Sequence, residues 1–169
     1  MNTYEISNIL KKDECTKSIF LDVYAVDQLP KEKIAQDRWL LIANCCPIER
    51  PGKHWVCIYG DKSTGIEFFD SFGLSPVKYD GKIAQFFYAQ GCTEKTDVKY
   101  NATHLQNLDT DVCGHYCILF SRLRAIGKDM TTIVEWLCQL NRDSIVKRIV
   151  NTGFDEDSII YEMISIFRQ

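Results

Sequence analysis

The chain has 169 residues, of which 46% are hydrophobic and 25% are charged, with 20 Lys and Arg against 23 Asp and Glu. These values are ordinary for one globular domain, and they exclude a disordered chain, collagen and a coiled coil. The formal net charge of −3 also argues against the basic balance that strong nucleic-acid binding requires. We therefore expect a single domain over residues 1–169.

The chain contains no apolar stretch of signal-peptide type at its N-terminus and none of membrane-spanning length. Its longest apolar run, Trp39 to Cys46, is interrupted by Asn44. We expect an intracellular protein with no membrane contact. In a reducing compartment most of the eight cysteines should be free thiols, and a free buried cysteine behaves as a small hydrophobe.

The first third of the chain predicts mainly extended structure. Asn8 to Asp13 is polar and predicts an irregular segment, whereas Ile19 to Val26 is β-branched and aromatic and predicts a short strand or an extended segment. Lys31 to Ala35 is compatible with a short helix or with a surface crossing. Trp39 to Cys45 is a continuous apolar run of strand length, which predicts a buried strand.

A β-hairpin is predicted next. His54 to Gly60 and Ile66 to Asp70 read as two strands on either side of a polar turn. If Gly60 pairs with Thr64, His54 lies opposite Asp70 on the same face, at the distance of an imidazole and its carboxylate partner. This inference depends on the register, and an exposed histidine beside a loop aspartate is equally compatible with the hairpin alone.

The second half of the chain predicts helices. Gly81 to Gln90 has helical spacing and Val98 to Thr103 suggests another strand, but Cys113 to Ile126 is the clearest helix, with one apolar stripe and Gly127 as its C-cap. Its candidate N-caps are Asp109, Thr110 and Asp111. The further helical segments are Ile133 to Leu140, Ser144 to Val150 and Asp157 to Phe167. Strands first and helices after predict an α+β fold, with an antiparallel sheet packed on a central helix.

Cys113 is the cysteine in the most reactive sequence position. The positive end of a helix dipole stabilises a thiolate at the first turn, and a thiolate nucleophile also needs a base oriented by an acid. Among three histidines, His115 should project to another side of the helix and His104 lies in an expected loop. His54 is the histidine to which the hairpin gives an acid partner.

Gln106 is a candidate donor to an oxyanion. Acyl transfer needs hydrogen-bond donors aimed at the developing negative charge, and a glutamine amide together with the backbone N–H of Cys113 could supply two. A lone loop glutamine is more often an ordinary surface residue.

These residues together resemble a known family. The matching strings are Gly52-Lys53-His54-Trp55, Phe69-Asp70-Ser71-Phe72-Gly73, Leu105-Gln106 and Asp111-Val112-Cys113-Gly114-His115-Tyr116-Cys117. Their order, His, Asp, Gln and Cys, resembles the adenovirus-type cysteine endopeptidase (adenain) and the related SUMO-specific proteases. The resemblance extends from about Phe20 to about Arg124 and is closest to viral members.

The resemblance implies a cysteine protease domain of the adenain/papain-like type and a role for each matched residue. Cys113 would be the nucleophile, His54 the base, Asp70 the residue that orients it, and Gln106 part of the oxyanion hole. Trp55 would narrow the substrate channel and favour glycine near the cleaved bond, although core packing explains a tryptophan on a strand equally well. The implied substrates are viral precursor proteins cleaved during virion maturation, in the host nucleus or cytoplasm or in the virion.

The resemblance also bears on partners. It implies no required cofactor or metal, a protein or peptide substrate and a monomer. Adenain is stimulated by DNA and by a viral peptide that disulfide-bonds to it, but the net charge of −3 argues against DNA stimulation here. An activating peptide is compatible with the sequence, and Cys92 is a candidate acceptor for its thiol, although no spacing supports this and an inert cysteine is the simpler interpretation.

Three alternatives stay open. A protease that removes ubiquitin or SUMO-like modifiers would use the same four residues. A catalytically inactive relative could serve as a binding or structural protein. A zinc module would draw on the soft ligands Cys45, Cys46, Cys113, His115 and Cys117, but these lack paired C-x-x-C spacing.

Overall fold

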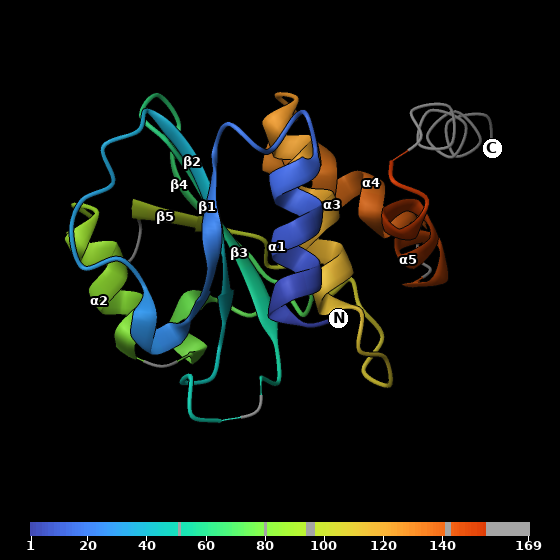
Figure 1. Ribbon diagram of the computed structural model, residues 1–169, viewed down its shortest axis with the longest axis horizontal. Helices are drawn as coiled ribbons and strands as arrows, with labels where there is room; N and C mark the ends of the chain where they lie inside the picture. Colours follow the sequence, from blue (N-terminus) through green and yellow to red (C-terminus); the bar gives the residue numbers. More distant parts are fainter. Residues whose placement is uncertain (51, 80, 94–96, 141–142, 155–169) are drawn as a thin grey trace.

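The computed structural model describes residues 1–50, 52–79, 81–93, 97–140 and 143–154 (Figure 1). In chain order its helices and strands are α1 (Thr3–Lys12), β1 (Phe20–Ala25), β2 (Arg38–Asn44), β3 (Trp55–Asp61), β4 (Gly65–Phe69), α2 (Gly81–Ala89), β5 (Val98–Tyr100), α3 (Cys113–Ala125), α4 (Met130–Leu140) and α5 (Asp143–Asn151). Short 3₁₀ turns occupy Val26–Gln28 and Pro76–Lys78. The predicted helical segment Asp157 to Phe167 lies outside the described residues.

The strands form one five-stranded sheet in the order β1-β2-β3-β4-β5. The three central strands pair antiparallel, as the hairpin and the apolar run predicted. The outer strands differ from the prediction of an antiparallel sheet, because β1 pairs parallel with β2 and β5 pairs parallel with β4. Each parallel pair is joined by a connection long enough to carry the chain back to the end at which the first strand began, so no short hairpin turn marks the pairing in the sequence.

Helices cover both faces of the sheet and confirm the α+β class. Figure 1 shows α2 on one side, with α1, α3, α4 and α5 on the other. One apolar core lies between the sheet and α3, and a second, smaller core lies between the sheet and α2. Because the sheet is covered on both faces, β2 and β3 are buried almost throughout, which explains their continuous apolar sequences.

The central helix α3 is buried nearly all round. The sequence predicted one apolar stripe, but residues of every face of α3 are buried, including the glycine and histidine of its first turn. Strand β3 packs against one side of α3, and α1, α4 and α5 contact it from the others. Gly127 ends the helix in the left-handed region, at φ +90°, as the C-cap prediction required.

The prediction of irregular structure over Asn8 to Asp13 is wrong, because α1 includes all but the last of these residues. Asn2 and Glu5 form a capping box at its start, in which each side chain binds the other's backbone N–H. Ile6 and Leu10 are fully buried against the core that includes α3. Of the two interpretations of Lys31 to Ala35, the surface crossing is correct, since the segment contains no helix.

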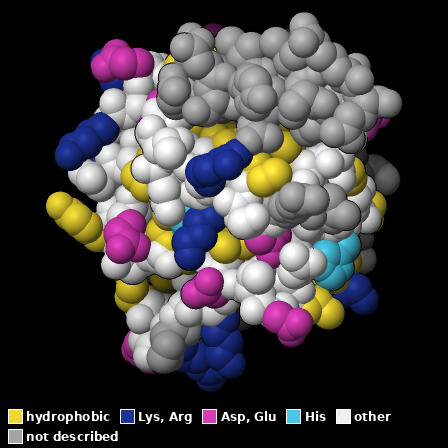
Figure 2. Space-filling model, turned by 90° about the vertical axis from the view of Figure 1, so that its right-hand side faces the viewer, with side chains coloured by type: hydrophobic (Ala, Val, Ile, Leu, Met, Phe, Trp, Pro, Cys, Tyr) yellow, Lys and Arg dark blue, Asp and Glu magenta, His cyan; other side chains and the backbone are white. Residues whose placement is uncertain are grey.

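Within the described residues, no helix is long and apolar enough to cross a bilayer. Figure 2 views the molecule from the right-hand side of Figure 1, and basic and acidic side chains are interspersed over that face. The described residues of this face therefore form no continuous patch of one charge.

Candidate functional site

His54 and Asp70 form a buried hydrogen-bonded pair. His54 immediately precedes β3 and Asp70 immediately follows β4, so the two residues lie at the same end of the hairpin. The imidazole Nε2 lies 2.7 Å from Asp70 Oδ1. The histidine is 9% exposed and the aspartate is fully buried. The exposed-histidine alternative is therefore wrong.

The register that brings the pair together differs from the predicted one. Gly60 pairs with Ile66 rather than with Thr64, because the strands close at Asp61 and Gly65, so the turn lies one residue later in the chain than expected. Continued beyond the strands, this register places His54 opposite Phe72, whose ring stacks on the imidazole with centroids 4.8 Å apart. The aspartate becomes a diagonal neighbour of the histidine, and an even shift leaves both on one face of the sheet.

The Asp70 carboxylate is held by four donors. Besides His54, the backbone N–H of Phe72 donates to Oδ1 at 2.9 Å, and the backbone N–H of Leu74 and the Tyr79 hydroxyl donate to Oδ2 at 3.0 and 2.6 Å. Burial alone would raise the pKa of Asp70, but these hydrogen bonds outweigh it and hold the pKa below its usual value. The carboxylate therefore stays ionised and fixed in orientation.

The backbone of the turn after β4 is fixed as well. Asn101 accepts a hydrogen bond from the Asp70 N–H at 2.8 Å and donates one to the Asp70 carbonyl at 2.7 Å. Gly73 adopts φ +68°, and a Cβ there would lie 2.6 Å from the backbone of Thr103. Only glycine meets both conditions. Sequence reasoning did not identify Asn101 or Tyr79, and no local pattern marks either one, because each reaches Asp70 from a loop.

The start of α3 differs from the capped end that the sequence predicted. Val112 occupies the N-cap position and makes no side-chain capping bond, so Asp109, Thr110 and Asp111 are not the cap. The first backbone N–H groups of α3 are therefore not occupied by a capping side chain. Cys113, the first residue of the helix, is 7% exposed.

The Cys113 thiol lies beside the imidazole. Burial raises the pKa of this thiol, but its hydrogen bond with His54 and those from the backbone N–H groups of Trp55 and Gly114 outweigh burial and lower the pKa below the ordinary value. His54 uses Nε2 for the aspartate, which leaves Nδ1 for its second partner. The geometry favours a thiolate.

The pKa of His54 is shifted in the opposite direction to that of Cys113. Burial lowers its pKa, but the hydrogen bonds with Asp70 and Cys113 outweigh burial and raise the pKa to about 9. The protonated imidazole is therefore stable between a carboxylate and a thiolate. Such an arrangement supplies a nucleophile and a proton donor at neutral pH.

Gln106 is almost completely buried, at 1% exposure, in the loop between β5 and α3. Its Oε1 accepts from the Ser71 hydroxyl at 2.8 Å, and its Nε2 donates to the Thr110 carbonyl at 2.6 Å. The Ser71 carbonyl also accepts from the backbone N–H groups of Leu105 and Gln106. These bonds fix which end of the amide is the nitrogen, and an NH₂ group has a second N–H to donate. Gln106 is thus a held donor rather than a surface residue.

Trp55 follows the histidine as the first residue of β3 and is 9% exposed. Its carbonyl accepts a hydrogen bond from the Cys117 thiol, so the tryptophan backbone is tied to α3. Its side chain packs in the core with α3 and also lines a groove of about 320 Å³, together with Met1, Asn44 and Ile48. Core packing is therefore confirmed, whereas the residues that line this groove include neither Cys113 nor His54, and the role of Trp55 as a channel wall stays a prediction.

The other histidines and Cys92 lie in different surroundings. His104 is in the expected loop and approaches the Gln106 carbonyl at 2.6 Å. His115 is buried on α3, and burial, the N-terminal ammonium and Lys147 lower its pKa. Cys92 is partly buried near α2, and burial and Asp97 raise the pKa of its thiol. None of these carries the paired charges that surround Cys113.

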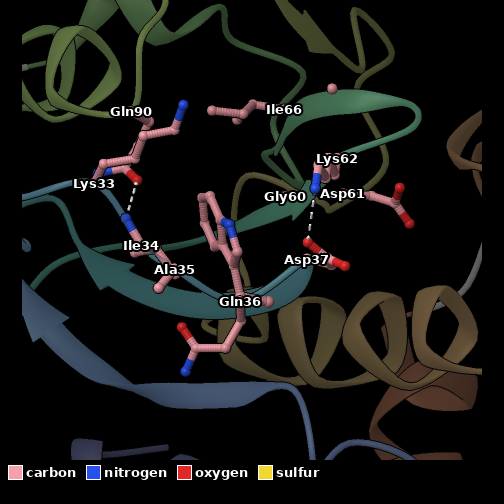
Figure 3. Close-up of a pocket in the computed structure, with 12 residues that line it drawn as sticks. Lys33, Ile34, Ala35, Gln36, Asp37, Gly60, Asp61, Lys62, Ile66 and Gln90 are labelled. Atoms are coloured by element: carbon pink, nitrogen blue, oxygen red, sulfur yellow. Dashed lines mark hydrogen bonds and ion pairs between the residues drawn. The ribbon is translucent and has the colours of Figure 1, made fainter.

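All eight cysteines are free thiols. Within the described parts of the chain, no three His, Cys, Asp or Glu side chains are grouped so as to hold a metal ion. A pocket of about 610 Å³ lies at the other end of β3, where Trp39 packs against Gly60 and where Lys33, Asp37 and Lys62 reach the rim (Figure 3). The residues that line this pocket include neither histidine nor cysteine.

No family model matches the chain, and no curated protein matches it by sequence. Among solved structures, the ASFV pS273R protease is similar at 19% identity with a TM-score of 0.56, over 79% of this chain and 60% of that one. The central domain of the uncharacterized Lpg1148 protein from Legionella pneumophila is similar at 15% identity with a TM-score of 0.52, over 91% and 96%. The chain spans less than two thirds of the protease it resembles. It therefore shares an α+β fold with a viral cysteine protease.

Proposed function

We propose that the chain is a cysteine endopeptidase in which Cys113 is the nucleophile, His54 the acid and base, and Asp70 the residue that orients the imidazole. The observation that carries the proposal is the buried series from carboxylate to imidazole to thiol at the start of α3, with a lowered thiol pKa and a raised imidazole pKa. The shared fold with a viral cysteine protease supports the same conclusion.

The proposed reaction follows from these positions. The Cys113 thiolate attacks the scissile carbonyl carbon, and the carbonyl electrons move onto oxygen. The second N–H of Gln106 and the backbone N–H of Cys113 stabilise this oxyanion. As the tetrahedral intermediate collapses, protonated His54 gives its proton to the departing amine nitrogen, leaving a thioester. Neutral His54 then takes a proton from water as the water attacks the thioester, which releases the carboxylic acid and regenerates the thiolate.

The substrate class proposed is a peptide with glycine near the cleaved bond, in viral precursor proteins. Trp55 lies on the groove beside the thiol's helix, where a bulky wall favours an unbranched chain. The reaction needs only side chains of this protein and water, so no cofactor is required. Activation by a peptide and the monomeric state stay predictions. Removal of ubiquitin-like modifiers uses the same residues, and cleavage of such conjugates, in place of precursor proteins, would favour that alternative.

The test is the substitution Cys113→Ala. We expect hydrolysis of glycine-containing peptides to fall by at least about 10³-fold, because the thiol that is hydrogen-bonded to His54 and forms the thioester is removed. Iodoacetamide at neutral pH should label Cys113 faster than the other cysteines, because its thiol pKa is lowered. Cys138→Ala is the matched control, since Cys138 is exposed on α4. An active, folded Cys113→Ala protein would refute the proposal.

A further inference from the structure

The loop that holds Gln106 is organised around one buried carboxylate. Residues 101–112 form no helix or strand, yet Gln106 is almost fully buried and the loop leads directly into Cys113. Asp143, the first residue of α5, is 6% exposed and faces this loop. It comes from the C-terminal region, to which the sequence analysis gave no role in the site.

Three donors converge on the Asp143 carboxylate. The backbone N–H of Asn107 donates to Oδ2 at 3.1 Å, and the Thr110 hydroxyl donates to the same oxygen. The Tyr116 hydroxyl lies 2.9 Å from Oδ1 and 3.2 Å from the Leu105 carbonyl. A buried carboxylate needs such donors to offset its lost hydration, and here every donor comes from the loop or from the first turns of α3.

These contacts connect Asp143 to the amide of Gln106. Thr110, whose hydroxyl binds Asp143, also provides the carbonyl that accepts from Gln106 Nε2 at 2.6 Å. Tyr116 lies one turn beyond Cys113 on α3, so the same carboxylate links the loop to the helix that carries the thiol. The Thr110 carbonyl would shift if Asn107 and Thr110 lost their common partner, and Gln106 Nε2 would lose its fixed acceptor, with only Ser71 left to hold the amide.

We propose that Asp143 is a positioning residue for the oxyanion hole, which holds Gln106 in place through Thr110. The proposal rests on the proposed peptidase function. It allows the oxyanion hole to be tested separately from the ion pair of Cys113 and His54. Alkylation of the thiol requires the ion pair with His54 but no oxyanion donor, whereas peptide hydrolysis requires both. Asp143 should therefore matter for hydrolysis and not for alkylation.

The experiment compares Asp143→Ala with wild type in steady-state hydrolysis and in iodoacetamide labelling. Loss of one oxyanion donor costs about 10²–10³-fold in kcat, so a displaced donor should cost about 10- to 100-fold, with KM within about threefold. The alkylation rate of Cys113 should stay within about twofold. Asp129→Ala is the matched control, because Asp129 also binds a threonine hydroxyl near a helix start, remote from the loop.

Asp143→Asn should restore most of the activity. Its carbonyl oxygen can accept from Asn107 and Thr110, and its amide can donate to the Tyr116 oxygen while that hydroxyl donates to Leu105. If Asp143→Ala does not fold, Thr110→Val removes one link and should lower kcat with alkylation preserved. A folded, fully active Asp143→Ala protein would overturn the inference, as would equal losses in hydrolysis and alkylation. A wild-type chain that hydrolyses no peptide would instead overturn the proposed function, and this inference with it.

Discussion

The two ends of α3 each lie against a buried pair of opposite charges, but the pairs have different surroundings. At the first turn, His54 and Asp70 pair beside the Cys113 thiol. Near the last turn, Arg124 and Glu67 pair, with Arg124 Nε 2.8 Å from Glu67 Oε2. Both carboxylates come from β4 or from the residue after it, and all four charged residues are below 10% exposure.

The difference is in the partners of each pair. The Arg124 guanidinium lies over the ring of Tyr59, 4.2 Å from its centroid, and it also binds the Lys128 carbonyl. Neither contact involves a nucleophile. Burial raises the pKa of Glu67 and Arg124 lowers it again, with a net rise. This pair fixes the end of α3 to the sheet, whereas the histidine pair can exchange a proton with a thiol.

Arg124→Met is expected to have the largest effect on stability. The substitution keeps an apolar stem but leaves Glu67 buried without its cation, and loss of one partner of a buried pair costs about 3–5 kcal/mol. For a chain of this size, the Tm should fall by roughly 6–20 °C. Activity per folded molecule should stay near that of wild type. Thermal unfolding followed by circular dichroism measures the change.

Two further variants sharpen this result. Adding Glu67→Met to Arg124→Met should recover most of the lost stability, because no uncompensated charge is then buried. His54→Ala should abolish peptidase activity with a smaller change in Tm, because three other hydrogen-bond donors remain on the buried Asp70 carboxylate. If Arg124→Met abolished the activity of the folded protein while leaving the Tm unchanged, the assignment of the two pairs to different roles would be wrong.

The pH dependence of activity should depend on the His54 pair and not on the Arg124 pair. Because the Cys113 pKa is lowered, the thiolate survives at mildly acidic pH and is lost as pH falls through that lowered value. Because the His54 pKa is raised to about 9, the imidazolium is kept at neutral pH and is lost as pH rises through about 9. We expect a bell-shaped profile of kcat/KM whose limits belong to the coupled pair.

The control for this profile is Asp70→Asn. Without the carboxylate, the His54 pKa should fall towards its ordinary value of about 6.5, and the alkaline limit should move to lower pH. Arg124→Met should leave both limits in place. An alkaline limit that did not move in Asp70→Asn would contradict the ion pair as the source of the profile.

The sequence predicted correctly that His54 and Asp70 meet, but it predicted the wrong register for the hairpin that brings them together. The pairing partner of His54 was wrong by two residues, yet the histidine and aspartate meet, because an even shift of register preserves the face of each residue. The predicted contact between His54 and Asp70 therefore survived a register error of two residues, whereas an error of one residue would have placed them on opposite faces. The start of the helix at Cys113 was also predicted correctly, from apolar residues spaced three and four apart, although the helix is buried on every face.

Residues that act from loops could not be predicted in this way. Tyr79, Asn101 and Asp143 reach the site through turns and through a distant helix, and no period of 2 or 3.6 relates them to Cys113. The first helix was missed although the capping box of Asn2 and Glu5 marks its start. For α3 the sequence predicted a capping side chain that the structure does not contain. A side-chain cap would occupy backbone N–H groups at the helix start, where the Gly114 N–H binds the thiol instead.

The smallest expected effect is that of Tyr79→Phe. The hydroxyl donates to Asp70 Oδ2 at 2.6 Å, but three other donors remain on the carboxylate after its loss. A hydrogen bond to a charged group contributes about 1.5–3 kcal/mol when nothing replaces it, and part of this should be recovered. We expect kcat to fall by about three- to tenfold with KM unchanged. Tyr88→Phe, an exposed position on α2, is the matched control.

Comparing hydrolysis with alkylation shows which part of the site the Tyr79 hydroxyl supports. Tyr79 acts on the carboxylate that orients His54, so the alkylation rate of Cys113 should fall by the same factor as kcat. In Asp143→Ala, by contrast, only hydrolysis should fall. If Tyr79→Phe lowered kcat and left alkylation unchanged, the hydroxyl would be acting on the loop that holds Gln106 rather than on the ion pair of Cys113 and His54. A kcat within twofold of wild type would mean that the other three donors alone hold Asp70 in place.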